Sequence, residues 1–354
     1  MSNSAGNLTA RQSNVEILRI LAAMGVIALH YNDGAMYTVL DKASNLLVLQ
    51  ISECVWAWPV NVFIMIMGYF SYTRKSSDLK KPITLIFQLI VFQVLEYVYW
   101  ICRGNSEFSV STLLAQLVPT DYFLVIYIAL FLISPYLNIL FSSFDRKGRR
   151  NLLFLLFLIF SVYSYLTNVL TVWSGIDFTK ANPVSLSGDI YGHCIVNFVL
   201  CYLTGASISD GTLEIKKPGI VFLSATFCVV GLGFAFGTLT AFSYSSPFVI
   251  LQAASLLSMF KGLRVGNIRI INNLAKAGIT VYLTHPVLLG LCGREMFMWS
   301  RPWVLFAHIV LTQVGLFLAG YLIHQVYTAL TEPMFKWVWK KVRLPEIRPI
   351  RIEK

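Results

Sequence analysis

Long runs of apolar residues, separated by short polar and charged segments, make up most of the chain. A helix needs roughly 20 mainly apolar residues to cross about 30 Å of hydrocarbon. By this criterion the pattern predicts ten membrane-spanning helices, at residues 15–32, 46–72, 82–102, 121–142, 151–172, 190–209, 217–237, 244–260, 275–292 and 303–329. The expected fold class is therefore all-α, a polytopic membrane protein with residues 1–354 forming one membrane domain.

The composition agrees with the pattern and excludes a soluble globular enzyme. Apolar residues make up 56% of the 354 positions and charged residues 13%, against about 45–50% and about 25% in soluble domains. The net charge of +11 does not indicate nucleic-acid binding, because the charges lie in short clusters between apolar runs and no recognition motif is present. The six cysteines show no metal-ligand spacing, so we expect no metal site.

Basic residues distinguish the two sides of the membrane. Of the 28 Lys and Arg, 22 lie in the N-terminal segment (1–14), the basic tail (333–354) and alternate loops, five lie in the other loops, and Arg19 lies within the first span. Cytoplasmic loops carry the excess of positive charge. Both chain ends are therefore expected on the cytoplasmic side. The expected location of the protein is the plasma membrane. The first span begins with Glu16 and Arg19 and has no cleavage site after it, so it is not a signal peptide.

Ionisable residues inside spans are costly and mark candidate functional sites. The first span contains Glu16, Arg19 and His30. Eleven helical steps from Arg19 to His30 amount to three turns plus about 20°, so the two share a face about 16 Å apart along the axis. Glu16 precedes Arg19 by three residues and can pair with it. The alternative is that Arg19 extends to the lipid headgroups and His30 only caps the outer end of the helix.

A second histidine, His285, lies near the middle of a later span and is followed by Pro286, which frees a backbone carbonyl. Two histidines within the membrane on separate helices suggest a polar cavity. The alternative for His285 is a hydrogen bond to a neighbouring helix. Glu96 and Asn61 either line the same cavity or bridge helices.

The remaining chemistry favours group transfer. Sequence motifs of serine hydrolases, zinc peptidases, P-loop proteins and dinucleotide-binding folds are all missing. A histidine without a metal cluster serves best as a general base, and an arginine suits a phosphate. Asp33 could hold the imidazole of His30, whereas His308 and His324 are interpreted as structural.

The spacing of Arg19 and His30, with Glu16 three residues before Arg19, resembles the first-helix signature of the acyltransferase family 3 membrane O-acyltransferases, which modify bacterial surface polysaccharides. Four further stretches are similar to family segments in the same order along the chain. They are VNVFIMIMGYF (60–70), YIALFLISPYLN (127–138), NFVLCYLTGASI (197–208) and SLLSMFKGLRVGNIRIINNLAKAGITVYLTHP (255–286).

The resemblance implies ten core helices, acetyl-CoA or another acyl-CoA as cytoplasmic donor, and a glycan hydroxyl as acceptor on the outer side. It makes His30 the catalytic base and Arg19 a residue that holds the donor or orients the site. From the residues themselves, we expect His285 to be the competing base and Glu16 to hold the guanidinium of Arg19 in place. Met67 stands where the family has Ser or Thr, so no hydroxyl function is carried over to that position. The expected partners are the acyl-CoA, the glycan, the lipid bilayer and polysaccharide-synthesis machinery, to which the chain could pass the acyl group.

The expected function is thus transfer of an acyl group, most simply acetyl, from CoA to a hydroxyl of a cell-surface polysaccharide, of the capsule or exopolysaccharide kind, or of its lipid-linked precursor. The alternative is a polysaccharide exporter or flippase that uses the same polar cavity as a conduit. A structural scaffold is a third class, which the histidines within spans do not favour.

The charge distribution makes the topology testable. Reporter fusions after Arg150 and after Lys217 should read cytoplasmic, and a fusion near Ala181 should read external, because basic loops stay in the cytoplasm. An external signal at either basic site would mean that a span is misplaced.

Overall fold

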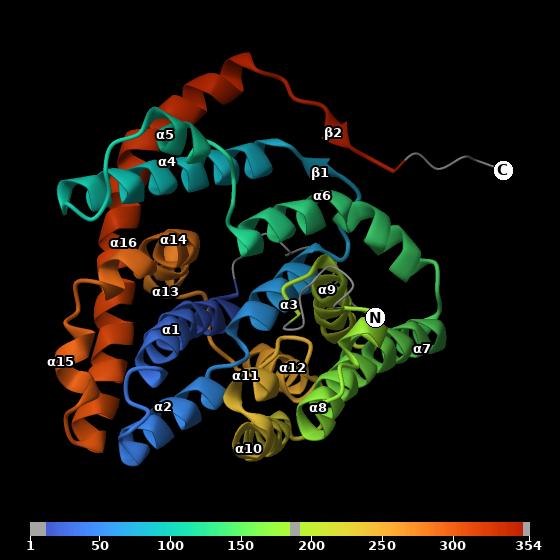
Figure 1. Cartoon of the computed structure of the whole chain (residues 1–354). Coiled ribbons are helices and arrows are strands. Elements are labelled where there is room, and N and C mark those ends of the chain that lie inside the picture. The colour runs from blue at the N-terminus through green and yellow to red at the C-terminus, as the bar shows by residue number, and fades with distance from the viewer. Residues whose placement is uncertain (1–11, 185–191, 350–354) are drawn as a thin grey trace.

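A computed structural model describes residues 12–184 and 192–349 (Figure 1). The beginnings of the predicted N-terminal segment and of the span 190–209, and the end of the predicted tail, lie outside these residues. The described chain is almost entirely helical, which confirms the all-α fold class. The helices are α1 (Ser13–Met36), α2 (Ala43–Val55), α3 (Pro59–Ser71), α4 (Lys80–Cys102), α5 (Val110–Ala115), α6 (Tyr122–Ser142), α7 (Arg146–Phe157), α8 (Ser164–Ser174), α9 (Ile195–Ser209), α10 (Pro218–Phe236), α11 (Thr238–Ala241), α12 (Pro247–Gly262), α13 (Arg269–Leu274), α14 (Gly278–Leu289), α15 (Arg294–Met298) and α16 (Pro302–Lys341).

Short irregular turns complete the chain path. A π-helical turn (Leu158–Tyr163) joins α7 to α8, and 3-10 turns lie at Thr179–Ala181 and Ala275–Ala277. Two-residue strands β1 (Ser77–Asp78) and β2 (Glu346–Ile347) pair antiparallel, with Ser77 opposite Ile347. This pairing brings the segment after α16 back to the connection between α3 and α4.

The described part of every predicted span is largely helical, but the number of ten spans stays a prediction. Seven helical stretches of the described chain are long and apolar enough to cross a membrane: 13–36, 43–71, 80–102, 122–142, 146–174, 218–236 and 302–341. Helices α9 and α12 are apolar but shorter, and α14 has 12 residues. These long apolar helices identify the chain as a membrane protein.

Two boundaries differ from those predicted. The span predicted at 46–72 is interrupted between Val55 and Pro59, because proline at the first turn of α3 lacks the N–H that would continue the preceding helix. Helix α16 continues beyond the span predicted at 303–329, through Pro333 to Lys341. A proline removes one hydrogen bond without ending a helix whose other turns stay paired.

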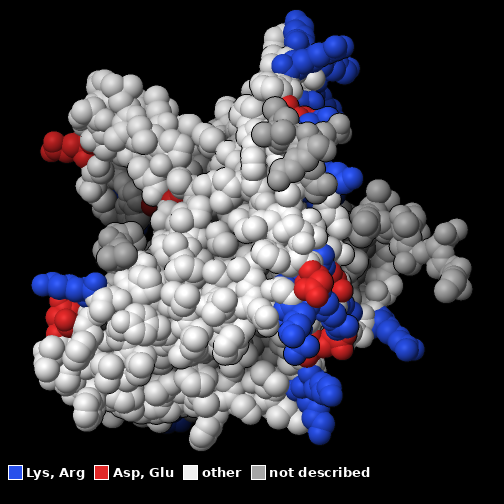
Figure 2. Space-filling view, turned by 90° about the vertical axis from the view of Figure 1, so that its right-hand side faces the viewer, with Lys and Arg blue, Asp and Glu red and all other residues white. Residues whose placement is uncertain are grey.

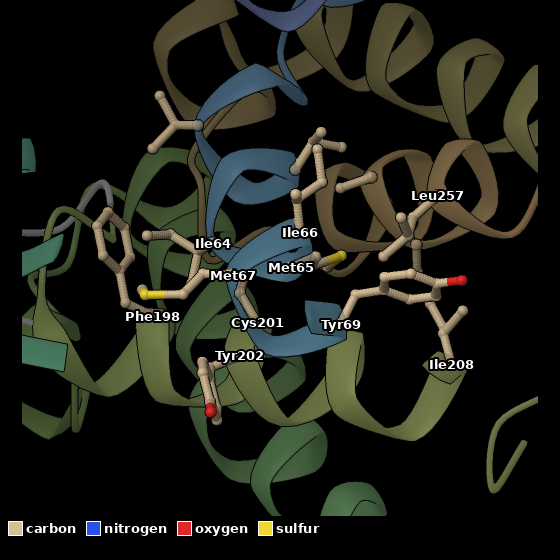
Figure 3. Packing of buried hydrophobic residues seen from close by; sticks show 14 of the residues in the cluster. Ile64, Met65, Ile66, Met67, Tyr69, Phe198, Cys201, Tyr202, Ile208 and Leu257 are labelled. Carbon is tan, nitrogen blue, oxygen red and sulfur yellow. The ribbon is translucent and has the colours of Figure 1, made fainter. Parts of the chain in front are cut away.

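Helix α3 lies at the centre of the largest apolar cluster and crosses α9 at very short range (Figure 3). A Cβ atom on Gly68 would lie 2.0 Å from the carbonyl oxygen of Tyr202, and one on Gly205 would lie 1.9 Å from that of Met65. Small residues at such crossings allow two backbones to touch inside a membrane. Both glycines are therefore required by the packing.

The outside of the molecule is apolar over wide areas. Figure 2 shows a face on which uncharged side chains cover most of the surface and charged ones gather at its edges. Helix α10 illustrates the cause, since Leu223 and Phe227 are 67% and 79% exposed. Exposed apolar area of this kind is stable against lipid rather than water.

The crossing of α3 and α9 yields a stability prediction. Gly205→Ala should lower the free energy of unfolding by about 1–3 kcal/mol, because the added methyl group forces two backbones apart. Gly231→Ala on α10 is the matched control, since nothing lies within 4 Å of its Cβ position, and it should be neutral or slightly stabilising. Thermal unfolding midpoints in detergent measure both, and equal midpoints would contradict the proposed close contact.

Candidate active site

Helix α1 carries a polar pair at the end nearest its N-terminus. The predicted pairing of Glu16 with Arg19 is confirmed, since Arg19 Nη1 donates to Glu16 Oε2 at 2.5 Å. Glu16 is buried, and the Arg19 side chain is 25% exposed. A buried carboxylate against one edge of the guanidinium fixes the direction in which the remaining N–H groups point.

A cavity of about 430 Å³ opens beside this pair. It is lined by residues of α1, α3, α4, α6 and α14, together with the segments that precede α4 and α14. Its charged lining residues are four cations and one carboxylate: Arg19, Arg74, Lys81, Lys276 and Glu16. This cavity, called the basic cavity below, has the charge to bind a polyanion.

Arg74 adds a free donor to the basic cavity. Its guanidinium lies 4.6 Å from the centre of the Phe131 ring, and its buried Nη1 has no hydrogen-bond partner among the described residues. A buried N–H without an acceptor is unfavourable. Such a group is suited to an anionic ligand that supplies the acceptor.

At the other end of α1, His30 meets His285 of α14, with ring centres 4.7 Å apart. Both histidines line a second cavity of about 480 Å³. Its other lining residues include carboxylates, amides and aromatic rings from α4, α6 and the segment that precedes α6, among them Gln93, Glu96, Tyr97, Trp100, Gln116, Asp121 and Tyr122. We call this the histidine cavity.

The two histidines differ in exposure and partners. His30 is exposed to the cavity, whereas His285 is only 2% exposed. The Nδ1 atom of His285 lies 2.6 Å from the carbonyl oxygen of Tyr282, and its Nε2 has no partner among the residues described. His30 is therefore the histidine that a ligand in the cavity can touch.

Asp121 is a site residue that the sequence analysis did not identify. Its Oδ1 accepts from the Leu124 N–H at 2.7 Å, which caps α6, and its Oδ2 accepts from the Tyr282 hydroxyl at 2.8 Å. An aspartate directly before an apolar run is typical of a helix cap. That signal accounts for the bond to Oδ1. The bond from the Tyr282 hydroxyl to Oδ2 could not be predicted from the sequence.

The two cavities lie along the same four helices, α1, α4, α6 and α14, and α1 and α14 are neighbours in the fold (Figure 1). Phe123 lines the basic cavity and Tyr282 the histidine cavity, and their ring centres are 5.1 Å apart. An aromatic pair therefore lies between a cationic compartment and a compartment with two histidines.

The family model of an acyltransferase domain, acyltransferase family 3, matches residues 12–325, nearly the whole chain. The chain belongs to acyltransferase family 3. Membership confirms the family indicated by the spacing of Arg19 and His30, and it makes the protein a membrane acyltransferase. No curated protein and no solved structure matches the chain.

The other polar residues of interest in this acyltransferase have distinct positions. Glu96 lines the histidine cavity. Asn61 instead bridges helices, since its Nδ2 donates to the carbonyl of Tyr244 at 2.8 Å and its Oδ1 accepts from Asn197 at 3.4 Å. Met67 lines the basic cavity.

Two further histidines form hydrogen bonds between helices, in agreement with a structural interpretation. His308 Nδ1 lies 2.8 Å from the Tyr31 hydroxyl, and His324 Nδ1 lies 2.9 Å from Thr280 Oγ1. Within residues 12–184 and 192–349, no hydrogen bond joins His30 to the exposed Asp33.

Proposed function

We propose that this acyltransferase moves an acetyl group from acetyl-CoA on the cytoplasmic side to a hydroxyl of a cell-surface polysaccharide or its lipid-linked precursor. The observation that carries the proposal is the pair of cavities along α1, one cationic and one with two histidines. In the proposed orientation both chain ends and the basic cavity face the cytoplasm, and the histidine cavity faces the outside of the plasma membrane.

The basic cavity suits the donor because coenzyme A carries several phosphate charges. Arg19, Arg74, Lys81 and Lys276 supply the opposite charge, and only one carboxylate, already paired with Arg19, competes with the ligand. Charge-assisted hydrogen bonds from arginine to phosphate are among the strongest polar contacts in proteins. The narrow acyl-bearing arm would then pass Phe123 and Tyr282 toward His30.

The histidine cavity suits a sugar acceptor, whose ring has apolar faces and a hydroxyl edge. Tyr97 and Trp100 offer aromatic surface for the faces, and Gln93 and Glu96 offer hydrogen-bonding groups for the edge. The indole Nε1 of Trp100 donates to Glu96 Oε1 at 3.3 Å, which orients both side chains. Aromatic side chains with a few placed polar groups are typical of small-ligand sites.

In the proposed reaction His30 takes the proton from the acceptor hydroxyl, whose oxygen forms a bond to the carbonyl carbon of the thioester. The carbon–sulfur bond breaks, and the protonated His30 returns its proton to the thiolate sulfur. A hydroxyl and a thioester thus become an ester and a free thiol, and His30 ends neutral. Assistance by a positioned base is typically worth about 10²–10⁴ in rate.

The donor proposal is tested by CoA binding to purified protein. Arg19→Ala should weaken binding about ten- to hundredfold, because a hydrogen bond to a charged group contributes about 1.5–3 kcal/mol. Arg19→Lys should recover only part of the affinity, since an ammonium lacks the planar fork.

Arg150→Ala is the matched control, because Arg150 is not among the residues that line the basic cavity. It should bind CoA as the unchanged protein does. Unaltered CoA affinity in Arg19→Ala would remove Arg19 from the donor site.

The base is tested with His30→Ala. Acyl transfer by this variant should fall about 10²–10⁴-fold, while its amount in the membrane and its CoA affinity stay near those of the unchanged protein. A near-normal rate of ester formation would exclude His30 as the base.

The same variant separates the enzyme from an exporter or flippase. Cells with His30→Ala should retain surface polysaccharide that lacks O-acyl groups, as observed by NMR of the isolated polymer. Loss of the polymer itself would favour the conduit.

A further inference from the structure

The base proposed above leaves His285 without a function, although it lies directly beside His30. The cavity reaches His30, whereas His285 is 2% exposed and its Nε2 is fully buried. A hydroxyl in the cavity therefore meets His30 first, because the Nε2 atom of His285 is covered although this residue also lines the cavity. His285 is placed to act on His30 rather than on the acceptor.

The hydrogen bond of His285 fixes which of its nitrogens carries the proton. A carbonyl oxygen only accepts, so the Nδ1 that lies 2.6 Å from the Tyr282 carbonyl must donate. In the neutral ring the lone pair is then on Nε2. The Tyr282 residue that supplies this carbonyl is itself held by Asp121, which accepts from its hydroxyl at 2.8 Å.

Nε2 of His285 is thus a buried acceptor that lacks a donor within the described chain. A buried polar atom without a partner costs free energy, so a nearby donor is favoured there. The His30 ring is that neighbour, at 4.7 Å between ring centres and with 44° between the ring planes. The His30 ring is also exposed to the cavity in which the acceptor would bind.

We propose that His285 is a positioning residue whose Nε2 accepts the N–H of one His30 ring nitrogen, so that the other nitrogen presents its lone pair to the acceptor hydroxyl. The inference rests on the proposed function of His30 as the base. A neutral histidine that exchanges between two tautomers offers its lone pair to the hydroxyl for only part of the time. If His30 is held in one tautomer, its lone pair faces the acceptor hydroxyl in every complex.

Two substitutions separate a positioning residue from a base. His285→Gln keeps an acceptor oxygen at the reach of Nε2 and cannot take up a proton near neutral pH. His285→Asn has an amide at the reach of Nδ1 only, so it loses the acceptor. Gln should retain kcat within a few fold, whereas Asn should lower kcat about ten- to hundredfold, with KM for acetyl-CoA unchanged in both.

His324→Gln is the matched control. His324 also contacts α14, through Thr280 at 2.9 Å, but it does not line the histidine cavity. It should leave kcat and KM unchanged. Thermal unfolding midpoints identify any variant whose loss of rate comes from loss of folded protein.

A second readout is independent of activity. The chain has five histidines, so ¹⁵N NMR of histidine-labelled protein resolves few signals, and His30→Ala assigns that of His30. The unchanged protein and His285→Gln should show one His30 tautomer, and His285→Asn should show a mixture.

Mixed His30 tautomers in the unchanged protein would overturn the proposal. So would a folded His285→Gln variant as inactive as His30→Ala, because His285 would then be the base. If the unchanged protein transfers no acyl group, the function proposed for the site fails, and the tautomer data alone decide whether His285 orients His30.

Discussion

A polar group inside a bilayer must find its partners within the protein, because lipid tails offer neither donors nor acceptors. Helix α1 meets this constraint at the centre of the fold, where α2, α3, α12, α14 and α16 pack around it. Glu16 and Arg19 satisfy each other at one end. At the other end His30 faces a second histidine and a cavity. The surrounding helices bury most of α1.

The same constraint explains why two cavities of different chemistry share one set of helices. Cations gather at the end of α1 that carries Arg19. There Lys81 lies in the first turn of α4, and Lys276 lies just before α14. Carboxylates, amides and aromatic rings gather at the end that carries His30. Phe123 and Tyr282 lie between the two. The two compartments therefore suit ligands of different charge.

Precise placement of α1 depends on backbones that approach very closely elsewhere. Helix α3, which packs against α1, also crosses α9 at Gly68 and Gly205, where no side chain fits. The interruption before Pro59 separates α2 from α3. Side chains of α3 such as Ile66 and Met67 then line the basic cavity. Packing far from the histidines therefore contributes to the shape of the basic cavity.

Local patterns in the sequence determined the all-α class, the approximate positions of the apolar segments, the family and the shared face of Arg19 and His30. Helical periodicity and hydropathy act over a few residues, so they predicted the Glu16–Arg19 pair as well. The contact of His30 with His285, the second bond of Asp121 and the aromatic pair between the cavities were decided only by tertiary structure. These contacts join residues up to 255 positions apart, and helix packing, not local spacing, determines which faces meet. The break before Pro59 has a local cause, the missing N–H of the proline. Pro333, by contrast, lies inside α16, and the sequence does not distinguish the two cases because the other turns of a helix can stay paired around a proline.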